Sequence, residues 1–280
     1  MTEKDRAADT AVCLIARDKF SEAPAALAAV YADLPARTSV TIVDCGYPPE
    51  LLDRMVRSAP APLPPPRVVS CPRFANTNTA WNAFVASTTA SVLICVENDV
   101  SVRPGCLPGL VEGLADGRFD VVTPVIHQGR LGDVHFDPPV SELVDQPDGA
   151  LLSRLVRRPK PDHPRVPGTR SIAHVEKHCY AMTRAAAQRL GELDELMHCR
   201  TDLELSLSCR SAGLRIGILP ALDAVFRKEP TVPDDVEVFT HRWNVERAGA
   251  ANDRLVKKWR LTRYKSSVEF VGEMLELLER

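Results

Sequence analysis

Two carboxylates and an amide stand together at the end of an apolar run in this chain of 280 residues. Glu97, Asn98 and Asp99 follow residues 91–96, whose side chains predict a buried strand. A chain usually keeps such groups in water, because burial of an unpaired carboxylate is costly. The strand therefore either ends as a solvated turn at "SVRPG" or holds a cationic group at its tip.

Predicted strands and helices, which must position these groups, alternate through the first half of the chain. Apolar runs predict strands at residues 11–16, 39–44, 67–71 and 91–96, and helical spacing predicts helices that begin near residues 21, 48, 79 and 107. Continuous apolar strands separated by helices indicate an α/β fold, in which a mostly parallel sheet has helices on both faces. Ligands bind such sheets at the carboxyl ends of the strands, where Asp44 and the Glu97–Asp99 pair stand.

The second half of the chain is less regular. Residues 127–170 are rich in Pro, Asp and Arg and show little periodicity, so we expect an irregular lid or binding loop, or a disordered segment. Residues 171–182 predict a strand, and one of its faces would carry His174, Glu176, His178 and Tyr180. That face forms either the floor of a binding site or an ordinary polar surface, and its spacing does not match the H-E-x-x-H zinc motif.

Residues 253–280 predict helical structure with an apolar stripe near the end. The stripe consists of Val271, Met274, Leu275 and Leu278. We interpret it as core or as the contact of a homodimer, because a helix that lies on a membrane would favour Lys and Arg around such a stripe.

Composition narrows the class of protein. The chain is 45% hydrophobic and 26% charged, and its net charge of −2 argues against a nucleic-acid-binding protein. It has no apolar run of membrane-spanning length, and its polar start does not resemble a signal peptide, so we expect a soluble cytoplasmic protein. Its 8 cysteines include no CxxC pair and are expected to be buried thiols rather than disulfides.

Several segments, taken in order, resemble bacterial family 2 glycosyltransferases of the GT-A fold. They are "TIVDCG", "FANTNTAWNAFVAST", "ICVENDVSVRPGCL", "LGELDE", "TDLELSLSCRSAGLRIGILP" and "NDRLVKKWRL". The resemblance covers most of residues 12–213. It implies a GT-A domain over residues 1–230, with the irregular insertion at 127–170, and a helical C-terminal extension over residues 231–280 that packs on the same domain.

The resemblance assigns the donor site to the ends of the early strands. It implies that Asp44 contacts the nucleotide base, although Asp44 is also suited to starting a turn before Cys45. Glu97, Asn98 and Asp99 take the place of the family's three acidic residues. Asp99 is thus expected to bind Mg²⁺ or Mn²⁺ on the donor diphosphate, with Glu97 on the same ion or on the donor sugar.

Two further donor-site positions follow from the same resemblance. Asn82 matches an asparagine that precedes the metal motif in the family, and Asn98 is counted with Glu97 among the groups that bind the donor. His241 is the candidate for a late metal ligand. Arg227 and Arg242 are alternatives that would neutralise the diphosphate.

The expected general base is Asp202, at the second position of the family's acidic pair, where Thr201 replaces the first. A carboxylate there would accept the acceptor's proton. A structural role competes, because Thr201 and Glu204 form a capping-box pattern and Gly213 is suited to ending the helix. The basic residues of the insertion are either a solvated loop or a site for anionic groups: Arg154, Arg157, Arg158, Lys160, Arg165 and Arg170.

The implied function is metal-dependent transfer of a hexose from a nucleoside-diphosphate-sugar to a hydroxyl acceptor, a small molecule or a glycan, with inversion. The alternative is a non-catalytic GT-A-like module that binds a nucleotide or a partner, since Thr201, Glu97 and Asn98 depart from the family pattern. A nucleotidyltransferase is disfavoured, because "ARDKFSE" after the first strand lacks the glycines of a phosphate loop.

Overall fold

The computed structural model describes residues 10–156, 166–263 and 268–275. Its central sheet has the strand order β10-β12-β6-β11-β4-β1-β2-β3, with β5 paired to β12 and β7 paired to β6. The strands are β1 (Thr10–Ile15), β2 (Thr38–Asp44), β3 (Arg67–Ser70), β4 (Val92–Glu97), β5 (Val100–Val102), β6 (Val121–Gln128), β7 (Val134–Phe136), β10 (Arg170–Ile172), β11 (Cys179–Thr183) and β12 (Ile216–Phe226).

Most of this sheet is parallel, as the sequence predicts. Strands β3, β2, β1 and β4 pair in parallel, and β6 pairs in parallel with β12. Strand β11 separates the two groups and runs antiparallel to both β4 and β6. The start of β11 therefore lies at the edge where the parallel strands end, and this places the residues before β11 beside Glu97.

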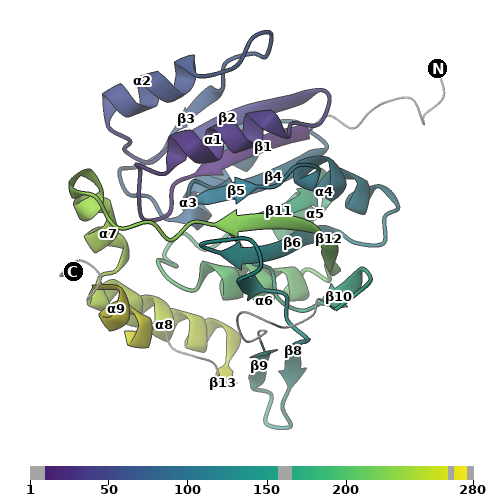
Figure 1. The fold of residues 1–280 in the computed structure, drawn as a ribbon. Helices are drawn as coiled ribbons and strands as arrows, with labels where there is room; N and C mark the ends of the chain where they lie inside the picture. The colour runs from purple at the N-terminus through teal and green to yellow at the C-terminus, as the bar shows by residue number, and fades with distance from the viewer. Residues whose placement is uncertain (1–9, 157–165, 264–267, 276–280) are drawn as a thin grey trace.

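Helices lie on both faces of the sheet, and Figure 1 shows α1 in front of it and α3 behind. They are α1 (Ala23–Ala32), α2 (Pro49–Arg57), α3 (Thr77–Ser87), α4 (Cys106–Ala115), α5 (Arg184–Leu190), α6 (Thr201–Ser211), α7 (Val236–Arg242), α8 (Val245–Trp259) and α9 (Val268–Leu275). Among the described residues, no helix combines the length and apolar character needed to cross a bilayer.

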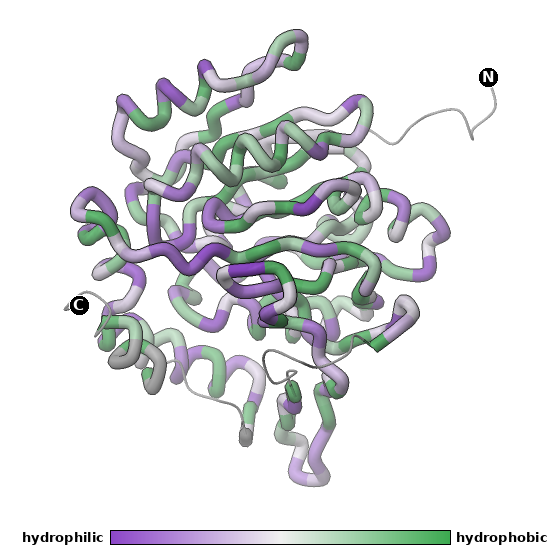
Figure 2. Tube along the Cα trace, viewed as in Figure 1, coloured by the Kyte–Doolittle hydropathy of each residue, from purple (hydrophilic) through white to green (hydrophobic). Residues whose placement is uncertain are grey.

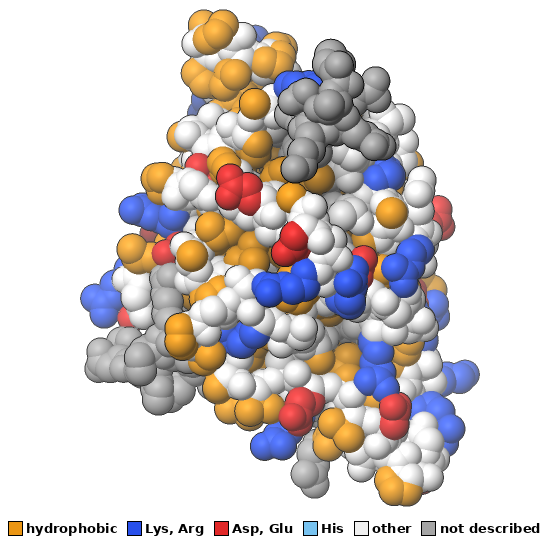
Figure 3. All heavy atoms as spheres, turned by 90° about the vertical axis from the view of Figure 1, so that its right-hand side faces the viewer, with side chains coloured by type: hydrophobic (Ala, Val, Ile, Leu, Met, Phe, Trp, Pro, Cys, Tyr) orange, Lys and Arg blue, Asp and Glu red, His pale blue; other side chains and the backbone are white. Residues whose placement is uncertain are grey.

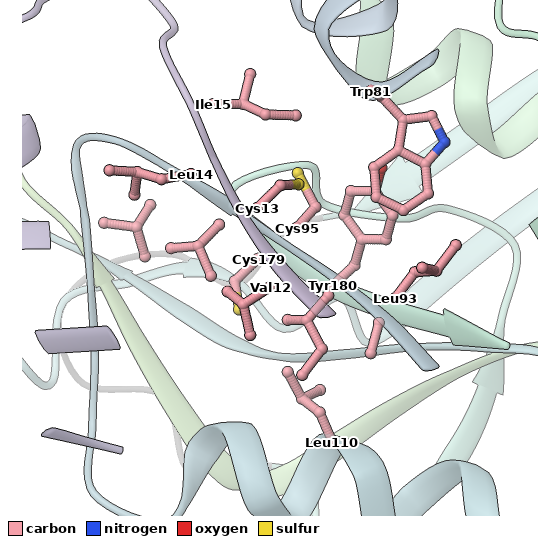
Figure 4. Close-up of a cluster of buried hydrophobic side chains, with 14 of the residues drawn as sticks. Val12, Cys13, Leu14, Ile15, Trp81, Leu93, Cys95, Leu110, Cys179 and Tyr180 are labelled. Atoms are coloured by element: carbon pink, nitrogen blue, oxygen red, sulfur yellow. The ribbon is translucent and has the colours of Figure 1, made fainter. Parts of the chain in front are cut away.

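The main core lies between the sheet and its helices, and Figure 2 shows hydrophobic residues along the central strands. Trp81 of α3 packs against Tyr180 of β11, with ring centroids 5.2 Å apart, and both side chains are fully buried (Figure 4). The cysteines are all free thiols, and each except Cys71 is buried, as expected.

The expectation of an irregular segment at residues 127–170 is wrong for most of its described part. This segment continues β6, forms β7, and then forms the hairpin of β8 (Val140–Asp145) and β9 (Leu151–Val156). The hairpin turns at Gly149, whose φ of +76° favours glycine. With β13 (Leu261–Arg263) it makes a separate three-stranded sheet. Residues 157–165, which carry several of the basic side chains, lie outside the described residues.

The single strand expected at residues 171–182 is also wrong. Residues 173–178 separate β10 from β11, because the chain must pass from one side of the sheet to its middle. His174 bonds Ser141 and Ser153 beneath the hairpin, and Tyr180 enters the core. Glu176 and His178 alone of the four enter the pocket described below.

A second apolar cluster joins the hairpin, α6 and the C-terminal helices. Val271 is fully buried in it, with Met274 and Leu275 packed against it, so the core interpretation of the C-terminal stripe holds for Val271. Leu278 lies outside the described residues. Beside the cluster, the fully buried carboxylate of Glu204 accepts hydrogen bonds from Lys258 Nζ and Trp259 Nε1, both at 2.6 Å, which connects α6 to α8.

The side of the molecule where β1 begins faces the viewer in Figure 3, where acidic and basic side chains lie among hydrophobic ones. Arg215 and Asp120, just before β12 and β6, form an ion pair of 3.0 Å at the amino ends of these strands. The pocket lies at the opposite, carboxyl ends of the parallel strands.

Strand β12 packs closely on Phe119 because it has no side chain at Gly217. A Cβ at Gly217 would lie 2.7 Å from Cγ of the buried Phe119 ring. We expect Gly217→Ala to lower the free energy of unfolding by about 1–3 kcal/mol, measured in urea. Gly249→Ala in α8 is the control, because a Cβ at Gly249 would meet no described atom within 4 Å outside the backbone of its own helix. This variant should raise the free energy of unfolding by about 0.4–1 kcal/mol. The same change in the free energy of unfolding for both variants would contradict the close packing at Gly217.

Candidate functional site

A pocket of about 670 Å³ lies at the carboxyl ends of β1, β4 and β12. Its wall includes Arg17, Glu97, Asp99, His135, Glu176, Lys177, His178, Asp202, Phe226, Arg227, Arg242 and Trp243. Its volume is in the range of pockets that bind small molecules. The structure thus brings three of the sequence-predicted site residues, Glu97, Asp99 and Asp202, to one pocket.

Arg17 and His178 contact both carboxylates at the tip of β4. Arg17 Nη1 lies 3.2 Å from Asp99 Oδ2, and Arg17 Nε lies 3.7 Å from Glu97 Oε2. His178 Nδ1 lies 2.7 Å from Glu97 Oε2 and 3.9 Å from Asp99 Oδ1. Both carboxylates are almost fully buried, so the solvated-turn interpretation of this strand end is wrong. The cationic partners allow the carboxylates to be buried.

The two carboxylates differ in their acidity. Burial raises the pKa of Asp99 to about 6, although Arg17 and His178 oppose the shift. Burial also acts to raise the pKa of Glu97, but His178, Arg17 and Arg242 lower it to about 2. Burial lowers the pKa of His178, but the carboxylates of Glu97 and Glu176 oppose this effect, and the net shift of its pKa is upward. Glu97 is therefore the anion that holds the His178 ring.

Asn98 and Asp44 form hydrogen bonds within the loops around the pocket. The amide of Asn98 is fully buried, accepts from the Arg17 backbone N–H at 3.2 Å and donates to Tyr47 Oη at 3.2 Å and to the Lys19 carbonyl. Asp44 Oδ1 accepts from the backbone N–H groups of Gly46 and Tyr47, both at 2.9 Å. Asp44 therefore makes the turn that the sequence allowed, and its role toward a base stays a prediction.

Asn82 fixes the loop that precedes α6. Its Nδ2 donates to the Leu193 carbonyl at 2.9 Å and to Glu195 Oε1 at 3.0 Å, and its Oδ1 accepts from the Leu193 backbone N–H at 2.9 Å. Asn82 does not line the pocket. The structure therefore does not bring it together with Glu97 and Asp99, and its role toward the donor remains untested.

Asp202 occupies the first turn of α6 and faces the pocket. The capping box expected around it is wrong, because the helix begins at Thr201 with Arg200 as N-cap, and no side chain caps it. Thr201 Oγ1 bonds Thr77 Oγ1 instead, and Glu204 bonds residues of α8. Gly213 does follow the end of α6 with a φ of +63°, as expected for a terminating glycine.

His241 does not line the pocket that contains the carboxylate pair. Its ring lies 5.0 Å from that of Phe74 and contacts the Arg247 guanidinium, in the wall of a separate, smaller pocket. Of the two alternative arginines, Arg227 pairs with Glu22 at 3.0 Å, and Arg242 lines both pockets. The third group beside Glu97 and Asp99 is His178, which the sequence had placed only on a strand face.

Lys177 is a site residue that sequence reasoning missed. The residue is 3% exposed, and burial lowers its pKa to about 8. It donates to Asn78 Oδ1 at 2.7 Å and Thr77 Oγ1 at 3.2 Å, and Thr77 Oγ1 lies 3.1 Å from Thr201 Oγ1. This series of bonds connects the starts of α3 and α6 behind the pocket.

The carboxylate pair fits a divalent cation. Asp99 Oδ1 is buried without a hydrogen-bond partner in the described part of the chain, and one ligand atom each from Glu97, Asp99 and His178 lies within 4.8 Å of the others. Carboxylate oxygens are the ligands that Mg²⁺ and Mn²⁺ prefer. An unsatisfied buried oxygen beside a second carboxylate is the kind of group that a cation would satisfy.

No protein-family model matches the sequence, and no curated protein matches it. Solved structures do match. The structure of "GalNAc-T7 with UDP, GalNAc and Mn2+" matches with a TM-score of 0.58 and 14% identity over 98% of this chain. The mannosyltransferase PcManGT from Pyrobaculum calidifontis, in complex with GDP-Man and Mn²⁺, matches with a TM-score of 0.57 and 14% identity over 98% of this chain. Residues 1–349 of S. aureus TarS, in complex with UDP-GlcNAc, match with a TM-score of 0.56 and 11% identity over 96% of this chain.

These similarities identify the fold. The chain spans 55% of the GalNAc-T7 chain and 71% of each of the other two. The mostly parallel sheet with helices on both faces is the GT-A fold of these glycosyltransferases, and the sequence-based prediction of the fold class is confirmed.

Proposed function

We propose that this protein is a family 2-type glycosyltransferase that moves a hexose from a nucleoside-diphosphate-sugar to a hydroxyl group, with a divalent cation and with inversion. The observation that carries the proposal is the pocket at the strand ends of a GT-A fold, which is lined by a buried carboxylate pair and by Asp202. The three similar structures are complexes with UDP, GDP-Man and UDP-GlcNAc, and two of them also contain Mn²⁺.

Asp99 and Glu97 would hold Mg²⁺ or Mn²⁺, which when bound neutralises charge on the donor diphosphate. The acceptor oxygen forms a bond to the anomeric carbon as the bond from that carbon to the diphosphate oxygen breaks. Asp202 takes the hydroxyl proton, and the nucleoside diphosphate leaves. Attack from the face opposite the leaving group inverts the anomeric carbon.

Arginines at the pocket supply further positive charge. Arg17 lies against both carboxylates, and Arg242 lies at the border of the two pockets. Guanidinium groups bind phosphate oxygens in a bidentate manner, so both are suited to the departing diphosphate. Arg17 would exchange its contact with Asp99 for the phosphate when the donor and cation enter.

One observation favours a second candidate, a GT-A-like module that binds a nucleotide or a partner without turnover. Arg17 and His178 already contact the two carboxylates, so the charge of Glu97 and Asp99 is compensated in part without a divalent ion. A module of this kind would bind a nucleotide in the same way with and without metal.

A thermal-shift panel tests the proposal. UDP, dTDP, GDP and CDP are each added with and without Mn²⁺ or Mg²⁺, and the melting temperature is measured. We expect one diphosphate to stabilise the protein only with metal, by about 2.7 kcal/mol at a concentration of 100 times its Kd. Stabilisation that is the same without metal would favour the non-catalytic module, and no shift with any nucleotide would contradict the proposed function.

A further inference from the structure

Three metal-ligating side chains that the proposed reaction does not use meet in the same pocket. His135 lies on β7, and Glu176 and His178 lie just before β11. Their side chains are 20%, 6% and 5% exposed, and one ligand atom from each lies within 4.8 Å of the others. The group is formed by segments about 40 residues apart in the chain, and we call it the His135–Glu176–His178 triad.

The distances in the triad are those of ligands around one ion. Two atoms bound to a tetrahedral ion at 2.0–2.1 Å lie roughly 3.3 Å apart, and the centres of two imidazoles on that ion lie roughly 5.2 Å apart. His135 Nε2 is 3.6 Å from Glu176 Oε2, and His178 Nε2 is 3.9 Å from Glu176 Oε1. The ring centroids of His135 and His178 are 5.4 Å apart. Small side-chain movements would bring the three ligand atoms to the spacing of ligands on one ion.

The other nitrogen of His178 determines which way the ring binds. Its Nδ1 forms an ion pair of 2.7 Å with Glu97 Oε2, which is shorter than the usual spacing of two ligands on one ion. Metal-binding imidazoles commonly have a carboxylate beside their second ring nitrogen. Glu97 therefore orients His178 so that Nε2 points toward Glu176.

Phe226 holds both imidazoles in place. Its ring stacks on His178 with a centroid distance of 4.4 Å and an interplanar angle of 14°, and it meets His135 edge-on at 5.7 Å. Rings held by packing lose little further freedom when they bind an ion. The triad is thus preorganised by one aromatic side chain and one carboxylate.

We propose that the His135–Glu176–His178 triad is a second cation site, which binds a divalent transition-metal ion such as Zn²⁺ or Co²⁺. Two imidazoles and one carboxylate favour such ions over Mg²⁺, which prefers oxygen ligands. The site is separate from the one proposed at Asp99, although Glu97 and His178 connect them. It does not depend on the proposed function, because it requires neither a nucleotide nor an acceptor.

The test is a titration of metal-free protein with Co²⁺ and Zn²⁺, without nucleotide. Calorimetry gives the affinity, and the visible spectrum of Co²⁺ reports nitrogen ligands. Loss of second-shell partners alone costs 10–100-fold in metal affinity, so His135→Ala should weaken Co²⁺ binding by at least about 100-fold. Glu176→Gln, which keeps the shape of the side chain, should do the same.

Two variants serve as matched controls. Asp99→Asn removes a carboxylate of the other proposed site, and His241→Gln removes a pocket-side histidine outside the triad. Both should retain Co²⁺ binding within a few-fold. Circular dichroism and melting curves establish that each variant is folded.

NMR of the ring nitrogens in the unmutated protein keeps the test independent of folding in the variants. On addition of Zn²⁺, the ring nitrogens of His135 and His178 should shift most among the 7 histidines. Wild-type affinity in His135→Ala, loss of binding in Asp99→Asn alone, or a largest shift at another histidine would overturn the proposal. The absence of binding of both Co²⁺ and Zn²⁺ to the wild-type protein would also overturn it, and the triad would then be only an ion-paired cluster.

Discussion

Replacing Asp202 with asparagine should lower kcat by about 10²–10⁴-fold, the usual contribution of a general base. Asparagine has nearly the same shape but cannot accept the acceptor's proton. Asp202 lies in the first turn of α6 and lines the same pocket as the carboxylate pair. The measurement is single-turnover transfer from the donor that the thermal-shift panel identifies, together with the Kd of that donor, which should hardly change.

A matched control separates proton transfer from an effect on helix stability. Asp202 is one of the acidic residues in the first turn of α6, where a negative charge also favours the helix dipole. Glu246 has the same position in the first turn of α8, outside the pocket, so Glu246→Gln should leave kcat unchanged. A loss of donor affinity with normal turnover in Asp202→Asn would assign this residue to binding instead.

Asp99→Asn should abolish the metal-dependent part of nucleotide binding. The substitution removes the charge of a buried carboxylate that has one oxygen without a hydrogen bond in the described part of the chain. Without that charge, the remaining anion, Glu97, is already engaged by His178 and Arg17. We expect the stabilisation by diphosphate and Mn²⁺, about 2.7 kcal/mol at 100 times the Kd, to fall to the value measured without metal.

The control for this variant is Asp253→Asn, because Asp253 is an exposed aspartate on α8, outside the pocket. It should melt with the same metal-dependent shift as the wild type. If Asp99→Asn also kept that shift, the cation would bind at another place, and the assignment of the carboxylate pair would be wrong.

The first strands of the sheet could be predicted because each is a local pattern. β1, β2 and β4 are continuous apolar runs, and all lie within a residue or two of their expected positions. The hairpin β8–β9 was missed although "QPDG" is a turn signal, since its strands are half-exposed and lack a clear apolar face. The capping box failed because tertiary partners compete for Thr201 and Glu204.

The site was predictable only where a strand end carries it. Glu97 and Asp99 end or follow a buried strand, and the same argument could have found Arg17, which follows β1. His178 and His135 could not be paired in this way, because their approach depends on the antiparallel insertion of β11 and on the pairing of β7 with β6. No spacing in the sequence records those long-range pairings.

The bond between α6 and α8 has a consequence for how this chain can be divided. Glu204 is fully buried, and it accepts hydrogen bonds from Lys258 and Trp259 of α8. Both partners belong to α8, so a chain that stopped after β12 would lose them together with the helix that carries them. We therefore expect a fragment that ends at Phe226 to be less stable than one that extends to Trp259, some thirty residues beyond the sheet that forms the pocket.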